Sequence, residues 1–219
     1  MINELQDYFL RQIKKKFEME QKQAILNSAF QSIEMGQSET GTLWPVGSNK
    51  NPYFIKAQNS FLKVLKTTPK NLVANVNLAM YYLDHKSIGK SLKHIKIALA
   101  ENSNVPEIQF LLGQCMDEQQ KPREAISAYK EAVRLNPKFF EAALNLALNL
   151  RITGQSTAAI QAFTHVLNLN PSHRNAHEHF GMTLLENGNH LEGLRELAKG
   201  VGFIEFQNNS SKSFCIFKG

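Results

Sequence analysis

A proline that returns at a fixed interval constrains this chain more than any other feature. Pro137 and Pro171 lie 34 residues apart, each directly after Leu-Asn, and Pro69 lies twice that interval before Pro137. Alanines recur 12 residues before these prolines and aromatic residues 8 before them, at Ala57, Ala125 and Ala159 and at Phe61, Tyr129 and Phe163. A fixed period of about 20 to 50 residues is typical of a solenoid, in which each repeat buries its apolar face against the next.

The repeat resembles the tetratricopeptide repeat (TPR) family, which combines a period of about 34 residues with an L-G/A-x2-Y element, an A-x3-F element and a closing proline. The copy that starts at Pro106 carries these elements in Leu112, Gly113, Ala125, Tyr129, Ala132 and Pro137, with Met116 in the aromatic position. The resemblance covers residues 22–205. It implies an all-α fold, a right-handed α-solenoid of antiparallel helix pairs, with an N-terminal helix and a short C-terminal β-like tail.

The period divides the chain into predicted segments. They are an N-terminal helix (1–20), a degenerate first repeat (21–71) with a loop insertion (36–52), three repeats (72–105, 106–139 and 140–173), a degenerate capping repeat (174–205) and a tail (206–219). The insertion is rich in Gly, Ser, Asn and Pro, as loops are, and contains the only tryptophan, Trp44. The predicted helices are Gln21–Met35, Tyr53–Leu65, Leu72–His85, Ile88–Ala100, Pro106–Gln119, Pro122–Leu135, Phe140–Thr153, Ser156–Leu169, Asn175–Asn187 and His190–Val201.

The final copy drifts from the pattern. Gly193 stands for the usual alanine, Leu197 for the aromatic residue and Gly200 for the next alanine. End repeats of a solenoid are atypical because one side has no neighbour, so this copy is expected to cap the array. The sequence after Val201 reads as two short β-like runs around a polar turn. They could form a hairpin over the last helix or the first strands of a further domain.

Composition is that of an ordinary soluble protein, with 42% hydrophobic and 20% charged residues. No apolar run approaches the roughly 18–20 residues needed to cross a bilayer. The N-terminus lacks a basic stretch followed by an apolar one, so no secretory signal is visible. Cys115 and Cys215 have no metal or redox spacing. We therefore expect a reduced, cytoplasmic protein.

Positive charge is concentrated in the first half of the chain. Residues 1–100 contain 14 Lys and Arg against 7 Asp and Glu, whereas residues 101–219 contain 11 against 12. A basic half can attract nucleic acid or anionic membrane, but lysines at helical spacing more simply form a solvated face. Aromatic residues that could stack on bases are not interleaved with these lysines, which disfavours nucleic acid as a partner.

The sequence predicts no enzyme activity, no cofactor and no metal site. It contains no Gly-rich phosphate loop after a strand, no G-x-S-x-G, no H-E-x-x-H and no cysteine pair. His173 and His177 are four residues apart and could share a helix face as metal ligands. The repeat register explains them otherwise, because it places His177 in an aromatic-preferring position and His173 in the turn between repeats.

The resemblance also implies a binding surface, because the first helix of each TPR pair lines the concave groove. The expected groove residues are Val76, Asn77, Met80, Glu107, Phe110, Gln114, Asp117, Glu141, Leu144, Asn145, Leu148, Arg151, Glu178, His179 and Met182. They are apolar residues among acidic ones. A partner with apolar and basic residues would complement them.

Two known binding modes of TPR proteins require particular residues at these groove positions. The carboxylate clamp needs lysines and an arginine that this register does not supply, so it is rejected. The asparagine ladder of O-linked N-acetylglucosamine transferase is matched by Asn77-Leu78-Ala79 and Asn145-Leu146-Ala147, but Leu111 and His179 interrupt it. An asparagine amide can both donate to and accept from a peptide backbone. A solvated groove asparagine is the simpler alternative.

We predict a protein–protein interaction adaptor or scaffold that binds a peptide or an amphipathic helix in the concave groove. The alternative is an N-terminal or accessory recruitment module of a larger enzyme, of the glycosyltransferase, sulfotransferase or hydroxylase type, which the β-like tail suggests. The sequence names neither the partner nor the oligomeric state.

Overall fold

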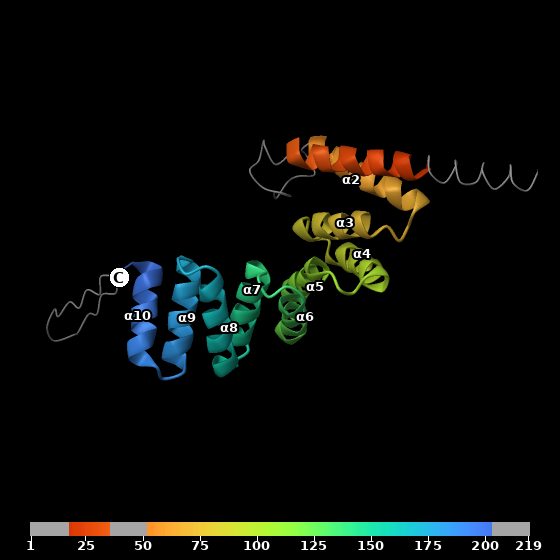
Figure 1. The fold of residues 1–219 in the computed structure, drawn as a ribbon. Helices are drawn as coiled ribbons and strands as arrows, with labels where there is room; N and C mark the ends of the chain where they lie inside the picture. Colours follow the sequence, from red (N-terminus) through yellow and green to blue (C-terminus); the bar gives the residue numbers. More distant parts are fainter. Residues whose placement is uncertain (1–17, 36–51, 203–219) are drawn as a thin grey trace, which may run out of the picture. The chain divides into compact units, whose positions relative to one another are not determined.

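The computed structural model describes residues 18–35 and 52–202, and the secondary structure within them is helical (Figure 1). The chain divides into two compact units, Met1–Ser103 (unit 1) and Asn104–Gly219 (unit 2). Unit 1 contains a helix over residues 18–35, α2 (Pro52–Thr67), α3 (Leu72–Asp84) and α4 (Ile88–Glu101). Unit 2 contains α5 (Pro106–Glu118), α6 (Pro122–Leu135), α7 (Phe140–Ile152), α8 (Ser156–Leu169), α9 (Arg174–Glu186) and α10 (His190–Val201). The fold is an α-solenoid of antiparallel helix pairs.

The helices predicted between Gln21 and Val201 are present, and most of their ends coincide with the prediction or differ from it by one or two residues. Pro52 was assigned to the loop insertion but is the first residue of α2, a position where its missing N–H costs nothing. The predicted first helices of the pairs ran one residue too far, because each ends at a C-cap residue: His85, Gln119, Thr153 and Asn187. Residues 1–17, 36–51 and 203–219 lie outside the described part, and with them most of the predicted N-terminal helix, Trp44 and the β-like tail. Residues 18–20 are helical and continue directly into the helix predicted from Gln21. The division into repeats stays a prediction.

A left-handed residue follows each of the helices α3, α5, α7 and α9, again at a spacing of 34 residues. The φ angles are 55° at Lys86, 57° at Gln120, 72° at Gly154 and 86° at Gly188. In each turn the next residue donates its N–H to the carbonyl five positions earlier, for example Lys121 to Met116 at 2.9 Å. This hydrogen bond satisfies a carbonyl that the helix end would leave unpaired. All four turns therefore have the same geometry, although only two of the four left-handed residues are glycine.

In unit 1, polar residues at contact positions are accommodated by backbone hydrogen bonds. Ser91 stands where the repeat prefers alanine; it is buried and its hydroxyl donates to the Ala79 carbonyl at 2.8 Å. Ser32 is buried as well and donates to the Ser28 carbonyl at 2.7 Å. The core of this unit is formed by the helix over residues 18–35, α2 and α3, with Phe54 and Phe61 fully buried.

In unit 2, α7 to α10 lie side by side in chain order (Figure 1), and small residues let paired helices approach closely. A Cβ on Gly113 of α5 would come 2.5 Å from the Tyr129 ring of α6. At the last pair, a Cβ on Gly181 would come 2.7 Å from the Gly193 carbonyl oxygen. The final copy departs from the repeat pattern because glycines on both α9 and α10 let the two backbones cross closely.

Replacing Gln120 by glycine should raise the free energy of unfolding of unit 2 by about 0.5–1 kcal/mol, because glycine adopts a positive φ without the steric cost of a side chain. Gly154→Ala is the matched control. A Cβ there would meet no atom within 4 Å, so its expected loss of about 1 kcal/mol reports conformation alone. Urea unfolding followed by circular dichroism measures both. A less stable Gln120→Gly variant would contradict the prediction.

Candidate peptide-binding surface

The predicted groove residues fall on the first helices of both units. Val76, Asn77 and Met80 lie on α3 of unit 1. The others lie in unit 2 and define the surface called the first-helix face: Glu107, Phe110, Gln114 and Asp117 of α5, Glu141, Leu144, Asn145, Leu148 and Arg151 of α7, and Glu178, His179 and Met182 of α9. The candidate site is the first-helix face of unit 2, because most of the predicted residues lie there.

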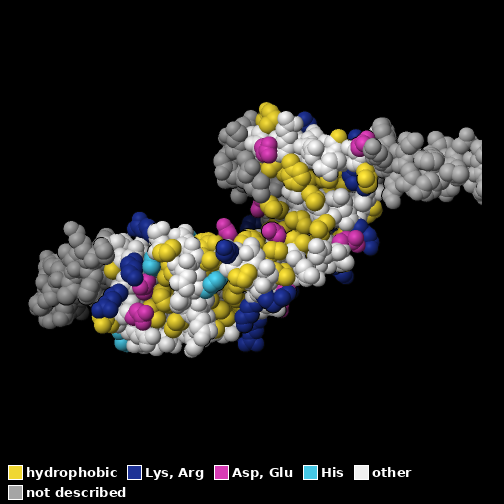
Figure 2. Space-filling model, viewed as in Figure 1, with side chains coloured by type: hydrophobic (Ala, Val, Ile, Leu, Met, Phe, Trp, Pro, Cys, Tyr) yellow, Lys and Arg dark blue, Asp and Glu magenta, His cyan; other side chains and the backbone are white. Residues whose placement is uncertain are grey.

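Side chains on the first-helix face remain accessible. Glu107 and Glu141 are exposed, and the remaining residues of the face are half-buried. By contrast, neighbouring positions on the same helices, such as Ala143 and Phe180, are buried in the core. Figure 2 shows one face of the molecule, on which hydrophobic side chains of unit 2 gather in patches interrupted by charged residues and histidine. Accessible apolar side chains among charges are suited to a protein partner.

A pocket of 510 Å³ is lined by the end of α5, the turn after it and α7. Three predicted residues line it, namely Asp117, Asn145 and Leu148, and the other lining residues are Gln120, Lys121, Pro122, Asn149 and Ile152. Ile152 is 71% exposed at the end of α7, which is unusual for a large apolar side chain. The predicted groove residues do not include these five. The signals available in the sequence were an isoleucine at the end of a predicted first helix and an asparagine within an otherwise apolar helix.

Asp117 is held by hydrogen bonds from two other helices. Its Oδ2 accepts from the Tyr129 hydroxyl at 2.6 Å and from Asn149 Nδ2 at 3.3 Å. Burial raises the pKa of the Asp117 carboxyl, while these two hydrogen bonds oppose the rise. Burial and the contact with Asp117 also raise the pKa of Tyr129. The carboxylate that the sequence assigned to ligand binding therefore also links α5, α6 and α7.

A second cluster joins α7 to α9. Arg151 Nη2 forms an ion pair with Glu186 Oε1 at 2.7 Å. His179 lies near this guanidinium: burial first, and then the charge of Arg151, lower the pKa of the imidazole, against the opposing charge of Glu178. Its ring stacks on Phe163, with centroids 6.5 Å apart and planes at 22°. The first-helix face thus contains an arginine that is ion-paired with Glu186 and lies near a histidine, beside the predicted acidic and apolar residues.

In unit 1, Asn77 donates its side-chain amide to the Val73 carbonyl of its own helix at 2.9 Å. Met80 packs against the core of unit 1, and Val76 is half-buried. The predicted asparagine ladder would pair Asn77 with Asn145 of the other unit. It stays a prediction.

The histidine pair has partners within the protein. His177 is buried, with Nδ1 2.6 Å from Glu196 Oε2 and Nε2 2.8 Å from the Pro171 carbonyl oxygen. His173 caps α9, where its Nδ1 accepts from the Ala176 N–H at 3.1 Å. Over residues 18–35 and 52–202 there is no group of three or more His, Cys, Asp or Glu arranged to hold a metal ion. Within the same ranges, no helix has the length and apolar character to cross a membrane.

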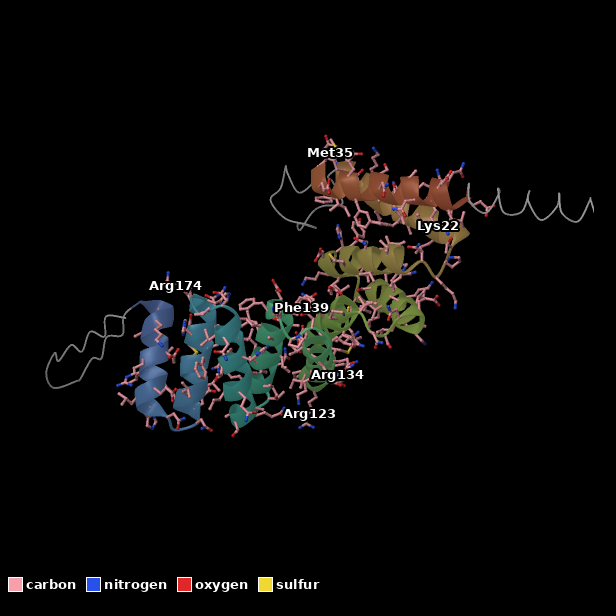
Figure 3. The ribbon with its side chains drawn as sticks, viewed as in Figure 1. Lys22, Met35, Arg123, Arg134, Phe139 and Arg174 are labelled. Atoms are coloured by element: carbon pink, nitrogen blue, oxygen red, sulfur yellow. The ribbon has the colours of Figure 1, made fainter. Side chains whose placement is uncertain are left out.

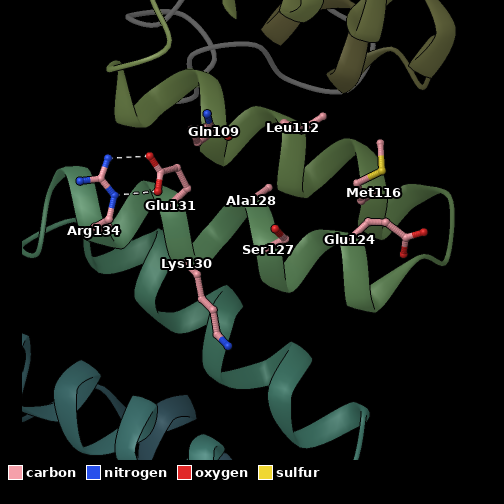
Figure 4. A pocket seen from close by; sticks show the side chains of 9 residues that line it. All are labelled: Gln109, Leu112, Met116, Glu124, Ser127, Ala128, Lys130, Glu131 and Arg134. Atoms are coloured by element: carbon pink, nitrogen blue, oxygen red, sulfur yellow. Dashed lines mark hydrogen bonds and ion pairs between the residues drawn. The ribbon is translucent and has the colours of Figure 1, made fainter.

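A larger pocket of 560 Å³ lies on the α5–α6 pair (Figure 4). Leu112, Met116 and Ala128 form its apolar lining, and Arg134 donates to Glu131 at its rim through two hydrogen bonds of 2.7 Å. The residues 34 positions after Leu112 and Met116, Leu146 and Leu150, are buried in the core of unit 2. The register therefore assigns this pocket to helix packing. The pocket on α5 and α7 is the better candidate for a ligand.

The family described as tetratricopeptide repeat matches residues 76–138 and 117–171. The chain is a TPR-like protein. This confirms the resemblance drawn from the recurring proline. No curated protein sequence matches this TPR-like chain.

The solved structures of MamA and YrrB share the fold. The crystal structure of MamA is 22% identical over 71% of this chain and 91% of its own, with a TM-score of 0.65. YrrB, described as a TPR protein with an unusual peptide-binding site, is 19% identical over 86% of this chain and 90% of its own, with a TM-score of 0.66. At this identity the likeness shows the fold alone.

Tyr129→Phe should lower the free energy of unfolding of the TPR-like unit 2 by about 1–2 kcal/mol, because it keeps the ring against Gly113 but removes the hydroxyl that donates to Asp117. Tyr82→Phe is the control, since the Tyr82 hydroxyl donates no hydrogen bond to a described residue. Chemical unfolding of both variants measures the difference. Equal losses would show that the Asp117 contact contributes nothing.

Proposed function

We propose that this TPR-like chain is a non-enzymatic interaction scaffold that holds a peptide or an amphipathic helix of a partner protein on the first-helix face of unit 2. The observation that supports the proposal is the pocket lined by Asp117, Asn145 and Leu148, three of the residues that the family resemblance implies as ligand contacts. The description of YrrB as a TPR protein with a peptide-binding site supports it by analogy of fold. A cytoplasmic location remains the expectation.

The apolar side chains of the face would supply most of the binding energy. Phe110, Leu144 and Leu148 pack against the core of unit 2 and are half-buried, so part of each side chain stays accessible. Burial of the remaining apolar surface by a partner contributes roughly 25 cal/mol per Å². Met182 is unbranched and polarizable, so it can adapt to partner side chains of different shape. The face therefore suits an apolar stripe, such as one side of an amphipathic helix.

Acidic side chains set the charge that the partner should carry. Glu107 and Glu141 lie in the first turns of α5 and α7, and neither forms an ion pair with a residue in the described ranges. Their carboxylates are free to pair with lysine or arginine of a bound segment. Complementary charges at the rim of an interface steer the encounter and fix its register more than they add affinity. Basic residues beside an apolar stripe are thus the expected signature of the partner.

The double variant Glu107→Lys and Glu141→Lys should weaken capture of the partner about tenfold, because two attractions become repulsions at about 0.5–1 kcal/mol each. Affinity capture with mass spectrometry compares it with the unaltered chain, and circular dichroism checks that both are folded. Glu124→Lys with Glu192→Lys is the control, since these exposed acids lie on the second helices α6 and α10. An unchanged set of captured proteins would move the site away from the first-helix face.

The recruitment-module alternative depends on the sequence after Val201. Residues 203–219 lie outside the described part of the chain, so it stays a prediction.

A further inference from the structure

Two buried polar atoms stand out on the first-helix face. Arg151 Nε and His179 Nδ1 are the only buried side-chain nitrogen or oxygen atoms in residues 18–35 and 52–202 that lack a hydrogen-bond partner there. Both belong to the same face, on helices that contact each other, α7 and α9. Buried polar groups are nearly always paired, because leaving one unpaired forfeits its hydration. Two such atoms on adjacent helices indicate a place where a ligand group completes the hydrogen bonding.

The chemistry of the two residues defines the group that would fit. The Arg151 guanidinium is always charged and offers five donors in a planar fork. Glu186 occupies Nη2 with one oxygen at 2.7 Å and is itself about half exposed. The lowered pKa of His179 keeps its ring neutral near pH 7, so the ring can place its single proton on Nδ1 and donate. A cation with a spare donor beside a neutral donor favours an anionic acceptor.

We propose that Arg151 and His179 form a subsite for a carboxylate on the segment that the first-helix face binds. The inference rests on the proposed function. Because Nε is buried, the Arg151 side chain must turn from Glu186 to receive the ligand. The incoming carboxylate then accepts from Nε–H and an Nη–H in a two-point contact, and from Nδ1–H of His179. One exposed carboxylate replaces another, and both unpaired atoms gain a partner.

The subsite predicts how positive and negative charges are arranged along the bound segment. Glu107 and Glu141 lie in the first turns of α5 and α7, whereas Arg151 and Glu186 lie in the last turns of α7 and α9. Successive helices are antiparallel, so alternate helices run in the same direction and their first turns lie at one edge of the face. A bound segment would therefore place basic residues at that edge and a carboxylate at the other. Glu186 acts as a competing carboxylate that an unsuitable ligand does not displace.

The subsite alone is tested by titrating the intact chain with sodium acetate, with sodium chloride at equal ionic strength as reference, and following arginine Nε–Hε signals by NMR. The Arg151 signal is assigned from its loss in Arg151→Lys. Acetate should shift it in the unaltered chain and at lower concentration in Glu186→Gln, where the competitor is gone. Arg123 on α6 (Figure 3) is exposed and provides the reference signal. A response of Arg151 no larger than that of Arg123 would overturn the proposal.

Three short synthetic peptides with the same Lys, Leu and Ala residues identify the source of the carboxylate. One has an internal Glu and an amidated end, one has Gln and a free C-terminus, and one has Gln and an amidated end. One of the first two should bind about tenfold tighter than the third, and Arg151→Gln, unlike Arg123→Gln, should remove the advantage. Equal binding of all three would overturn the subsite but leave the proposed function intact. Binding of none would count against the proposed function, while the acetate titration still decides the subsite.

Discussion

Close crossing of paired helices is the constraint on which the rest of unit 2 depends. Gly113 lets the Tyr129 ring lie against the backbone of α5, and Gly181 and Gly193 bring the backbones of α9 and α10 together. An added Cβ at any of these positions would meet atoms closer than 3.0 Å, so the helices would have to separate. Because this crossing fixes how each pair is rotated, it also fixes which side chains of α5, α7 and α9 point away from the core. The composition of the first-helix face is therefore a consequence of how closely the paired helices cross.

The core and the candidate site are connected through one side chain. Tyr129 fills the crossing with its ring and donates its hydroxyl to Asp117, which lines the pocket on the first-helix face. Asn149 of α7 reaches the same carboxylate, so three helices meet at a polar group beside the proposed ligand. Such a network positions the pocket before a partner arrives, which lowers the ordering cost of binding. The exposed carboxylates Glu107 and Glu141 carry no such structural contact with a described residue and are free for recognition.

The period in the sequence was sufficient to predict the helices, because helix packing depends on residue size at fixed positions. Contacts that depend on neighbouring repeats were not predictable. Asn149 and Asp117 are 32 residues apart and Arg151 and Glu186 are 35 apart, and nothing local in the sequence links them. The left-handed turns at Lys86 and Gln120 were missed because neither residue is a glycine. The boundary between the units follows Ser103, which lies 34 residues before Pro137 and stands where the repeat prefers a proline.

The most direct test of the proposed scaffold is site-specific photo-crosslinking in cells that produce the chain. A photoreactive residue replaces Ile152, which is exposed beside the pocket on the first-helix face, or Gln161, which is exposed on the second helix α8. We predict that position 152 crosslinks to a defined partner segment with apolar and basic residues, and that position 161 does not. Crosslinking of the same partner from position 161 alone would contradict the proposal, because the partner would then lie on the second helices.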